Sequence, residues 1–359
     1  MTGYDESRDV KINEQHYVFF LKTPKAPVVK SFLFAASAFR KLNQMRGRFP
    51  VDIAHVNLPL VPSFAVPTGF GKTLISTVHS TWKGEAEAIK GEPYSRLNSN
   101  EKFMVSFNWF LRIFEEKMLE RSNKIIAVSD FTRRELLQYY KVKEDKIRVI
   151  HNGVDVNKFQ PAGDKRKAKE ELGFSPDDIA ILSVGRLYAR KGLFTLIESV
   201  PAVVRRFPRA KFIISGKGQS DEMKKLVSHA TRLGVKDNII FTGYFPDSKL
   251  PRLYQAADVF AFSTFYENLP FAVLEALSSG LPVVTTNVGG IPEMIESGRN
   301  GFLVQPFNAR ELADRVLYFL EHPAAASEMA FVARKTILER FDWRLIVKKV
   351  LKVYDEALG

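Results

Sequence analysis

The sequence predicts an α/β protein built from two doubly wound parallel sheets. Short, nearly continuous apolar runs rich in Val and Ile alternate with longer stretches that have the apolar spacing of helices. Such runs are typical of parallel strands that helices cover on both faces. The alternation breaks once, at the polar and charged segment 156–178, and then resumes. A chain of 359 residues also exceeds one ordinary core and suits two domains.

The first half contains five predicted strands and three predicted helices. The strands are short, apolar and mostly β-branched: 16–23, 51–57, 72–80, 123–129 and 146–155, the last of which runs into an Asn-Gly turn. The helices have apolar residues on one face: 31–49, 100–122 and 130–140. Asp130 is a plausible N-cap of the third helix.

The second half repeats the pattern without repeating the sequence. Six apolar runs are expected to be strands: 179–187, 210–218, 238–245, 259–264, 281–290 and 301–306. The segments between them have helical spacing, and a last helix over 343–358 follows the complete sheet.

Composition and charge exclude several classes of protein. The chain has no cysteine, which rules out disulfides, thiolate metal sites and a cysteine nucleophile, and fits a reducing compartment. No apolar run approaches the ~20 residues of a spanning helix, and the polar start is unlike a secretory signal. We therefore expect a cytoplasmic protein, peripheral to a membrane at most. The net charge of +13 favours anionic partners such as phosphorylated substrates or anionic lipid, although a generally basic surface explains it equally well.

Basic residues follow the first strand of the second half. In an open parallel sheet, ligands bind at the carboxyl ends of strands, beside helix N-termini. Arg186 and Lys191 lie in such a position, and a guanidinium, an ammonium and helix amides together suit a diphosphate. The alternative is a pair of solvated basic residues. Gly216 and Gly218 follow the next strand and permit close backbone approach, but Gly-Lys-Gly is also an ordinary loop.

Two glutamates flank the start of a later helix. Glu267 is expected in the loop after strand 259–264, and Glu275 about a turn and a half inside the helix that Pro270 opens and Gly280 ends. Glu275 stands among apolar residues, so its carboxylate needs a partner. The hydroxyls of a sugar are suitable partners. Otherwise Glu267 merely complements the helix dipole and Glu275 faces water.

Taken in order, these segments resemble the donor half of the family 4 retaining glycosyltransferases. The matching segments are GRLYARKG, SGKG, TGYF with LYQAADVF, Glu267-x7-Glu275 and GLPVVTTNVGGIPEMIESGRNGFLV. The resemblance covers essentially all of 123–359 and implies the GT-B fold of two Rossmann-like domains facing a cleft. It implies an acceptor domain over 1–158, a nucleotide-sugar donor domain over 159–340, and a helix over 341–359 that packs back on the first domain.

The resemblance also implies roles for single residues. Glu275 would accept hydrogen bonds from ribose hydroxyls, and Glu267 would hold a hydroxyl of the donor sugar. Arg186 and Lys191 would stabilise the leaving diphosphate, so that neither a metal nor a cofactor is needed. His79, at the end of strand 72–80, matches the histidine that the family places near the donor sugar, although a lone histidine there is more often a satisfied loop residue. The implied catalytic residues are therefore Glu267, His79, Arg186 and Lys191. Further donor contacts are expected from Gly185, Gly216, Asn268, Leu269, Pro270 and Phe271.

The beginning of the chain departs from the family pattern. Nothing before HYVFFLKT resembles the strand, Gly-Gly turn and helix with which the family opens, so the first domain is expected to be incomplete at its start. Absence of that piece would expose apolar sheet edges.

The function implied is a retaining, metal-independent hexosyltransferase of glycan biosynthesis. Its donor would be a UDP- or GDP-sugar, and its acceptor a sugar, a polyol or a lipid-linked acceptor. Residues 103–121 are amphipathic, aromatic and flanked by basic residues, and would either rest on an anionic membrane, such as the inner membrane surface, or face the core. The alternatives are a sugar-nucleotide epimerase of the same fold and a non-catalytic sugar-nucleotide-binding protein. A nicotinamide dehydrogenase is disfavoured because no first strand leads into Gly-x-Gly-x-x-Gly, and nucleic-acid binding rests on net charge alone.

Overall fold

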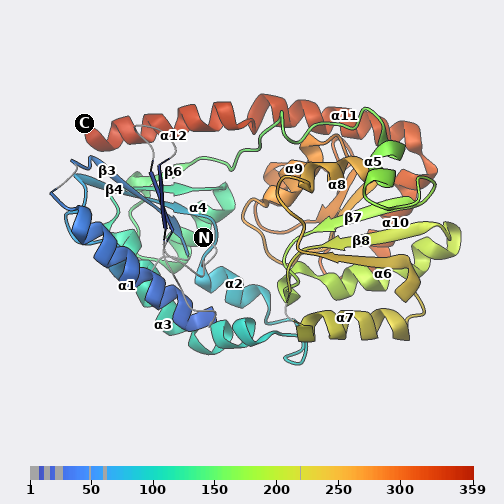
Figure 1. Cartoon of the computed structure of the whole chain (residues 1–359), viewed down its shortest axis with the longest axis horizontal. Coiled ribbons are helices and arrows are strands. Elements are labelled where there is room, and N and C mark those ends of the chain that lie inside the picture. Colours follow the sequence, from blue (N-terminus) through green and yellow to red (C-terminus); the bar gives the residue numbers. More distant parts are fainter. Residues whose placement is uncertain (1–7, 12–16, 21–26, 48–49, 60–62, 219) are drawn as a thin grey trace.

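The computed structural model describes residues 8–11, 17–20, 27–47, 50–59, 63–218 and 220–359, and it contains two parallel sheets with helices around each (Figure 1). The first sheet has the strand order β3-β4-β5-β6, and the second has the order β12-β11-β10-β7-β8-β9. Every pairing in both sheets is parallel. The predicted fold class is confirmed.

The first sheet lies in the N-terminal half. Its strands are β3 (Ile53–Leu58), β4 (Thr73–Val78), β5 (Lys124–Ala127) and β6 (Ile147–Val149). The helices of this half are α1 (Pro27–Met45), α2 (Trp82–Ala88), α3 (Ser99–Arg121) and α4 (Asp130–Tyr139). A separate antiparallel pair, β1 (Arg8–Lys11) and β2 (Tyr17–Phe20), precedes them.

The second sheet lies in the C-terminal half. Its strands are β7 (Ile179–Val184), β8 (Ala210–Ser215), β9 (Ile239–Gly243), β10 (Val259–Phe262), β11 (Val283–Thr286) and β12 (Phe302–Val304). The helices are α5 (Lys165–Glu171), α6 (Leu193–Arg206), α7 (Ser220–Arg232), α8 (Leu250–Ala256), α9 (Phe271–Ser278), α10 (Ala309–Glu321), α11 (Pro323–Arg340) and α12 (Trp343–Leu358).

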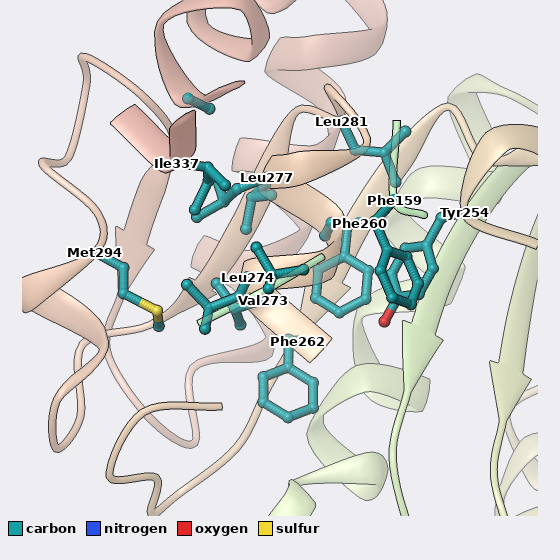
Figure 2. Close-up of a cluster of buried hydrophobic side chains, with 14 of the residues drawn as sticks. Phe159, Tyr254, Phe260, Phe262, Val273, Leu274, Leu277, Leu281, Met294 and Ile337 are labelled. Carbon is teal, nitrogen blue, oxygen red and sulfur yellow. The ribbon is translucent and has the colours of Figure 1, made fainter. Parts of the chain in front are cut away.

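Alternate residues of the strands pack against opposite helix layers. In the first sheet, Ile125 of β5 packs with α3 and α4, while the next residue, Ile126, packs against Ile346 of α12. In the second sheet, Phe260 of β10 packs against α8, α9 and α11, as Figure 2 shows for this cluster. Its neighbour Ala261 faces α6 and α10. Full burial of a Phe or Ile side chain contributes roughly 1.5–3 kcal/mol, so this alternation fixes which face of each strand is inward.

The two halves are joined twice. The connection after β6 meets the segment between α11 and α12, where the amide of Val154 donates to the carbonyl of Phe341 at 2.8 Å and the amide of Trp343 donates to the carbonyl of Val154 at 3.1 Å. From this crossing α12 runs over the first sheet while α11 lies on the second (Figure 1). Among the described helices, none is both long enough and apolar enough to cross a lipid bilayer.

Some local predictions were wrong. The N-cap of α4 is Ser129, whose hydroxyl accepts from the amide of Thr132 at 3.0 Å, so Asp130 is the first helical residue. Pro270 is the N-cap of α9 and Phe271 its first residue. Helices α2, α5 and α11 and strand β1 were not predicted. The expected absence of the family's opening elements concerns the chain before β2, most of which lies outside the described residues.

Candidate functional site

The strand order of the second sheet reverses between β7 and β10. From β7 the chain moves outward to β8 and β9, and from β10 it moves the other way to β11 and β12. Open parallel sheets bind ligands outside the carboxyl ends of their strands at such a reversal. The segments that follow the two central strands are 185–192 and 263–270. These segments contain most of the predicted site residues.

Lys191 and Glu267 meet at this reversal. The ammonium of Lys191 donates a hydrogen bond to Oε1 of Glu267, and the two side chains are only 12% and 10% exposed. The hydroxyl of Thr264 donates to the same oxygen at 3.2 Å. Burial lowers the pKa of Lys191, and the carboxylate of Glu267 opposes that shift. A buried cation and a buried anion thus compensate each other where a ligand would bind.

Gly192 explains why the segment after β7 reaches the end of β10. Its φ is +65°, and a Cβ atom there would lie 1.9 Å from the carbonyl oxygen of Ser263. The Ser263 hydroxyl donates to the carbonyl of Gly192 at 2.8 Å, and the amide of Phe265 donates to the carbonyl of Arg190 at 2.8 Å. Only glycine permits this contact, which holds Lys191 beside Glu267.

Arg190 was not selected from the sequence, yet it joins the same cluster. Its guanidinium lies 3.6 Å from Oε1 of Glu267 and 3.7 Å from Oε1 of Glu85 on α2. The cation therefore bridges the two halves of the chain. Arg190 stands within the segment GRLYARKG, but its partners Glu85 and Glu267 are far away in the chain, so the sequence did not indicate its role.

Arg186 lies directly after β7, in the loop that leads to Lys191. It is exposed, and its guanidinium carbon sits 5.7 Å from the centre of the Tyr188 ring. Gly185 and Gly216 lie side by side at the ends of β7 and β8, where the amide of Gly185 donates to the carbonyl of Ser215 at 2.9 Å. The three residues line the tip of the sheet, with Arg186 open to solvent.

Glu275 has the partner that its apolar surroundings require. The hydroxyl of Tyr254 on α8 donates to Oε2 of Glu275 at 2.8 Å. Burial raises the pKa of Glu275 to about 7, and the hydrogen bond from Tyr254 opposes the shift. Tyr254 is fully buried, so Glu275 is fixed on α9 while remaining partly accessible.

The loop that leads into α9 is held by the first half of the chain. Asn268 donates its side-chain amide to the hydroxyl of Thr132 on α4 at 2.7 Å. Asn152 donates to the carbonyl of Leu269 at 2.8 Å. Phe271 remains 43% exposed, and the His79 ring lies 6.4 Å from its ring, centroid to centroid.

His79 reaches this loop from the end of β4. One of its ring nitrogens lies 3.1 Å from the side-chain oxygen of Asn57. Burial lowers the pKa of His79, so the neutral imidazole prevails at neutral pH. The structure thus brings Lys191 into contact with Glu267, and His79 close to Phe271. It places Glu275 within α9, and it leaves Arg186 exposed to solvent after the end of β7.

Two family profiles match nearly the whole chain. "Glycosyltransferase Family 4" matches residues 3–158, and "Glycosyl transferases group 1" matches residues 164–336. The chain belongs to the family 4, or group 1, glycosyltransferases. A curated relative, an uncharacterized glycosyltransferase of Methanocaldococcus jannaschii, is 29% identical over 287 residues, which are 79% of this chain and 69% of the relative.

Solved structures of glycosyltransferases share the fold. A sucrose-phosphate synthase of Thermosynechococcus elongatus superimposes with a TM-score of 0.79 at 21% identity, over 99% of this chain and 86% of that one. Anabaena HepE in complex with UDP-glucose does so with a TM-score of 0.65 at 25% identity, over 79% and 72%. The arrangement is therefore GT-B. Several other curated relatives of this glycosyltransferase are matched over less than two thirds of their own length.

Proposed function

We propose that this glycosyltransferase moves a hexosyl group from a UDP- or GDP-sugar to a sugar, polyol or lipid-linked acceptor. We further propose that the anomeric configuration is retained and that no metal ion is required. The observation that carries the proposal is the buried Lys191–Glu267 pair at the reversal of the second sheet, with His79 facing the same loop from the other half.

A nucleotide sugar offers a partner to each charged group of the site. Its diphosphate suits the ammonium of Lys191, with Arg186 at the rim. A sugar hydroxyl suits the carboxylate of Glu267, and the ribose hydroxyls suit Glu275. Donor binding would therefore replace the Lys191–Glu267 contact by two contacts to ligand. As the glycosidic bond breaks, negative charge grows on the leaving diphosphate. The fixed ammonium of Lys191 would stabilise this charge most strongly in the transition state.

The acceptor would enter from the first half of the chain, on the side of His79. On the proposed route it attacks the same face that the diphosphate leaves, and a phosphate oxygen takes its proton. The neutral imidazole of His79 can accept or donate one hydrogen bond to the sugar without adding charge. Anabaena HepE has been crystallised with UDP-glucose, which favours a UDP-sugar as the first donor to try.

The decisive assay is release of nucleoside diphosphate from UDP-, GDP- and ADP-sugars with and without a panel of acceptors. The proposal expects release that depends on acceptor, a product with the donor's anomeric configuration by NMR, and a rate that EDTA changes less than about twofold. Isomerisation of donor alone would instead identify an epimerase. Binding, measured by thermal shift, without transfer to any acceptor would indicate a non-catalytic protein.

We also propose that a lipid-linked acceptor would be reached from a membrane surface formed by α1, α3 and the short segment Ser63–Ala65. Large apolar side chains are exposed there by 36% to 66%: Leu33, Phe39, Phe64, Val105, Phe107, Trp109 and Ile113. Basic residues of the same helices, including Arg40, Lys102 and Lys117, suit anionic headgroups.

Flotation with vesicles tests this surface. The chain is expected to float with phosphatidylglycerol vesicles and not with phosphatidylcholine vesicles, and Trp109→Glu should reduce flotation at least about fivefold. Phe331→Glu is the matched control, because Phe331 is 72% exposed on α11, away from this surface. Equal flotation of both variants, or none by the wild type, would refute membrane contact through α3.

A further inference from the structure

The residues on either side of Glu267 are both anchored to one carboxylate of the other half of the chain. The hydroxyl of Tyr266 donates to Oε2 of Glu135 on α4 at 2.8 Å. Asn268 donates its side-chain amide to the same oxygen at 3.1 Å. Glu135, Tyr266 and Asn268 are 5%, 5% and 2% exposed. The backbone position of Glu267 therefore depends on a group from α4.

The pair formed by Glu135 and Tyr266 also contacts the segment that follows His79. The amide of Thr81, the N-cap of α2, lies 3.4 Å from the Tyr266 hydroxyl. Helix α2 packs so closely on this pair at Gly84 that no side chain fits there. A Cβ atom at Gly84 would lie 2.1 Å from Oε1 of Glu135 and 2.3 Å from the hydroxyl of Tyr266. The loop with Glu267 and the segment after His79 are thus packed on one hydrogen-bonded pair.

The Glu135–Tyr266 pair joins the two halves at a cost in free energy, because its carboxyl is removed from water. No ion pair of Glu135 is seen within the described part of the chain, and burial raises its pKa to about 7. A buried carboxyl compensated by hydrogen bonds alone stabilises less than a well-packed apolar contact of the same volume. Hydrogen bonds, however, specify which atoms meet, and misplacement by about 1 Å can reduce a reaction rate by about 100-fold.

We infer that Glu135 is a positioning residue, which through Tyr266 and Asn268 holds Glu267 in the position that sugar transfer requires. The inference rests on the proposed function. Glu135 touches no reacting group itself. Its effect is on the geometry between a loop of the second half and a strand end of the first.

Three variants separate positioning from stability. Glu135→Leu keeps the volume and removes the acceptor, and Tyr266→Phe keeps the ring and removes the donor. Both should lower kcat at least about 10-fold while the donor KM changes less than about threefold, at a temperature at which both variants are folded. Glu135→Leu also leaves the buried Tyr266 hydroxyl without its acceptor, so its midpoint of thermal unfolding should fall. Glu135→Gln keeps an acceptor oxygen and should restore kcat to within about threefold of wild type.

Glu222→Gln is the matched control. The Glu222 carboxylate is also buried and accepts a hydrogen bond across the two halves, from Asn98, but it lies on α7 away from the loop with Glu267. It should leave kcat unchanged. Wild-type kcat in Glu135→Leu, or a loss in Glu135→Leu that Glu135→Gln fails to restore, would overturn the inference while leaving the proposed function standing.

A second measurement needs no turnover. Hydrogen–deuterium exchange of amides 263–269 should be faster in Glu135→Leu and Tyr266→Phe than in wild type, whereas exchange in β7 should be unchanged. Unaltered exchange in 263–269 would overturn the inference even if the wild type proved inactive. A wild type that transfers no sugar from any donor would refute the proposed function only.

Discussion

At the scale of single residues, the site compensates its own charges before any substrate is present. Glu267 has the ammonium of Lys191, and Glu275 has the hydroxyl of Tyr254. Glu275 could be selected from the sequence because a carboxylate inside an apolar helix needs a partner, and Glu267 because of its place before that helix and the family resemblance. The sequence does not show their partners, nor Arg190, Tyr266 and Glu135, because contacts between segments distant in the chain have no local sequence pattern.

Replacement of Glu275 should abolish donor turnover and spare the fold. Glu275→Ala removes the acceptor for two ribose hydroxyls, and hydrogen bonds to a charged group contribute about 1.5–3 kcal/mol each. We expect kcat/KM for the donor to fall at least about 100-fold. Tyr254 keeps a second acceptor, the carbonyl of Ala272 at 3.3 Å, so the thermal midpoint should change little. Glu339→Ala, an exposed change on α11, is the control. Transfer at the wild-type rate by Glu275→Ala would contradict the assignment.

Donor affinity should depend on pH through the same residue. The pKa of Glu275 is raised to about 7 by burial, and only the ionised carboxylate accepts two hydrogen bonds well. The donor KM should therefore fall as the pH rises from 6 to 8. Glu275→Gln should remove this dependence, and an unchanged pH profile in that variant would assign the titration to another group.

At the scale of elements, strands were predicted better than helices. All six strands of the second sheet appear as short apolar runs because both of their faces are buried. Helix α2 was missed because it is short and follows directly on a strand. Helix α11 was missed because apolar residues occur on both of its sides. Phe331 and Leu338 are exposed while Ala333 and Ile337 are buried, so the sequence shows no single apolar face.

Gly192 should be irreplaceable at the start of α6. Gly192→Ala would force the Cβ against the carbonyl of Ser263 and separate Lys191 from Glu267. We expect a loss of stability of more than about 2 kcal/mol, seen in urea unfolding. Gly173→Ala is a matched control, because Gly173 has a φ of +76° with nothing within 4 Å of a Cβ atom. It isolates the strain of positive φ, about 1 kcal/mol. Equal losses in the two variants would show that the contact with Ser263 is unimportant.

At the scale of the whole molecule, Glu115 and Glu135 are among the carboxyls buried in the folded chain, and Glu135 lies where the two halves meet. Burial raises the pKa of Glu115 to about 8 and that of Glu135 to about 7. Glu115 accepts from the amide of Trp82 at 3.2 Å and from the hydroxyl of Tyr140. Glu115 is buried by the packing of α2, α3 and α4 on one another, and Glu135 by the contact of α4 with the second half. The sequence alone shows only two glutamates in helices.

These carboxyls predict how stability depends on pH. Their pKa values are higher in the folded chain than in the unfolded chain, so the folded chain binds protons more tightly. Their contribution to the free energy of unfolding is complete below about pH 4.5 and is lost as the pH rises through 7 to 8. Urea unfolding should show a free energy that falls between pH 6 and 8. Glu115→Gln should weaken this slope, and a wild-type free energy that rises over the same interval would contradict the account.

A structure determined with UDP-glucose bound tests the central claim most directly. We predict that the diphosphate lies at the end of β7 on Lys191 and Arg186, that the ribose lies on Glu275, and that a sugar hydroxyl replaces Lys191 as the partner of Glu267. Nucleotide bound elsewhere, for instance in the cavity of about 760 Å³ beside His151 and Glu293, with the Lys191–Glu267 contact intact, would contradict it.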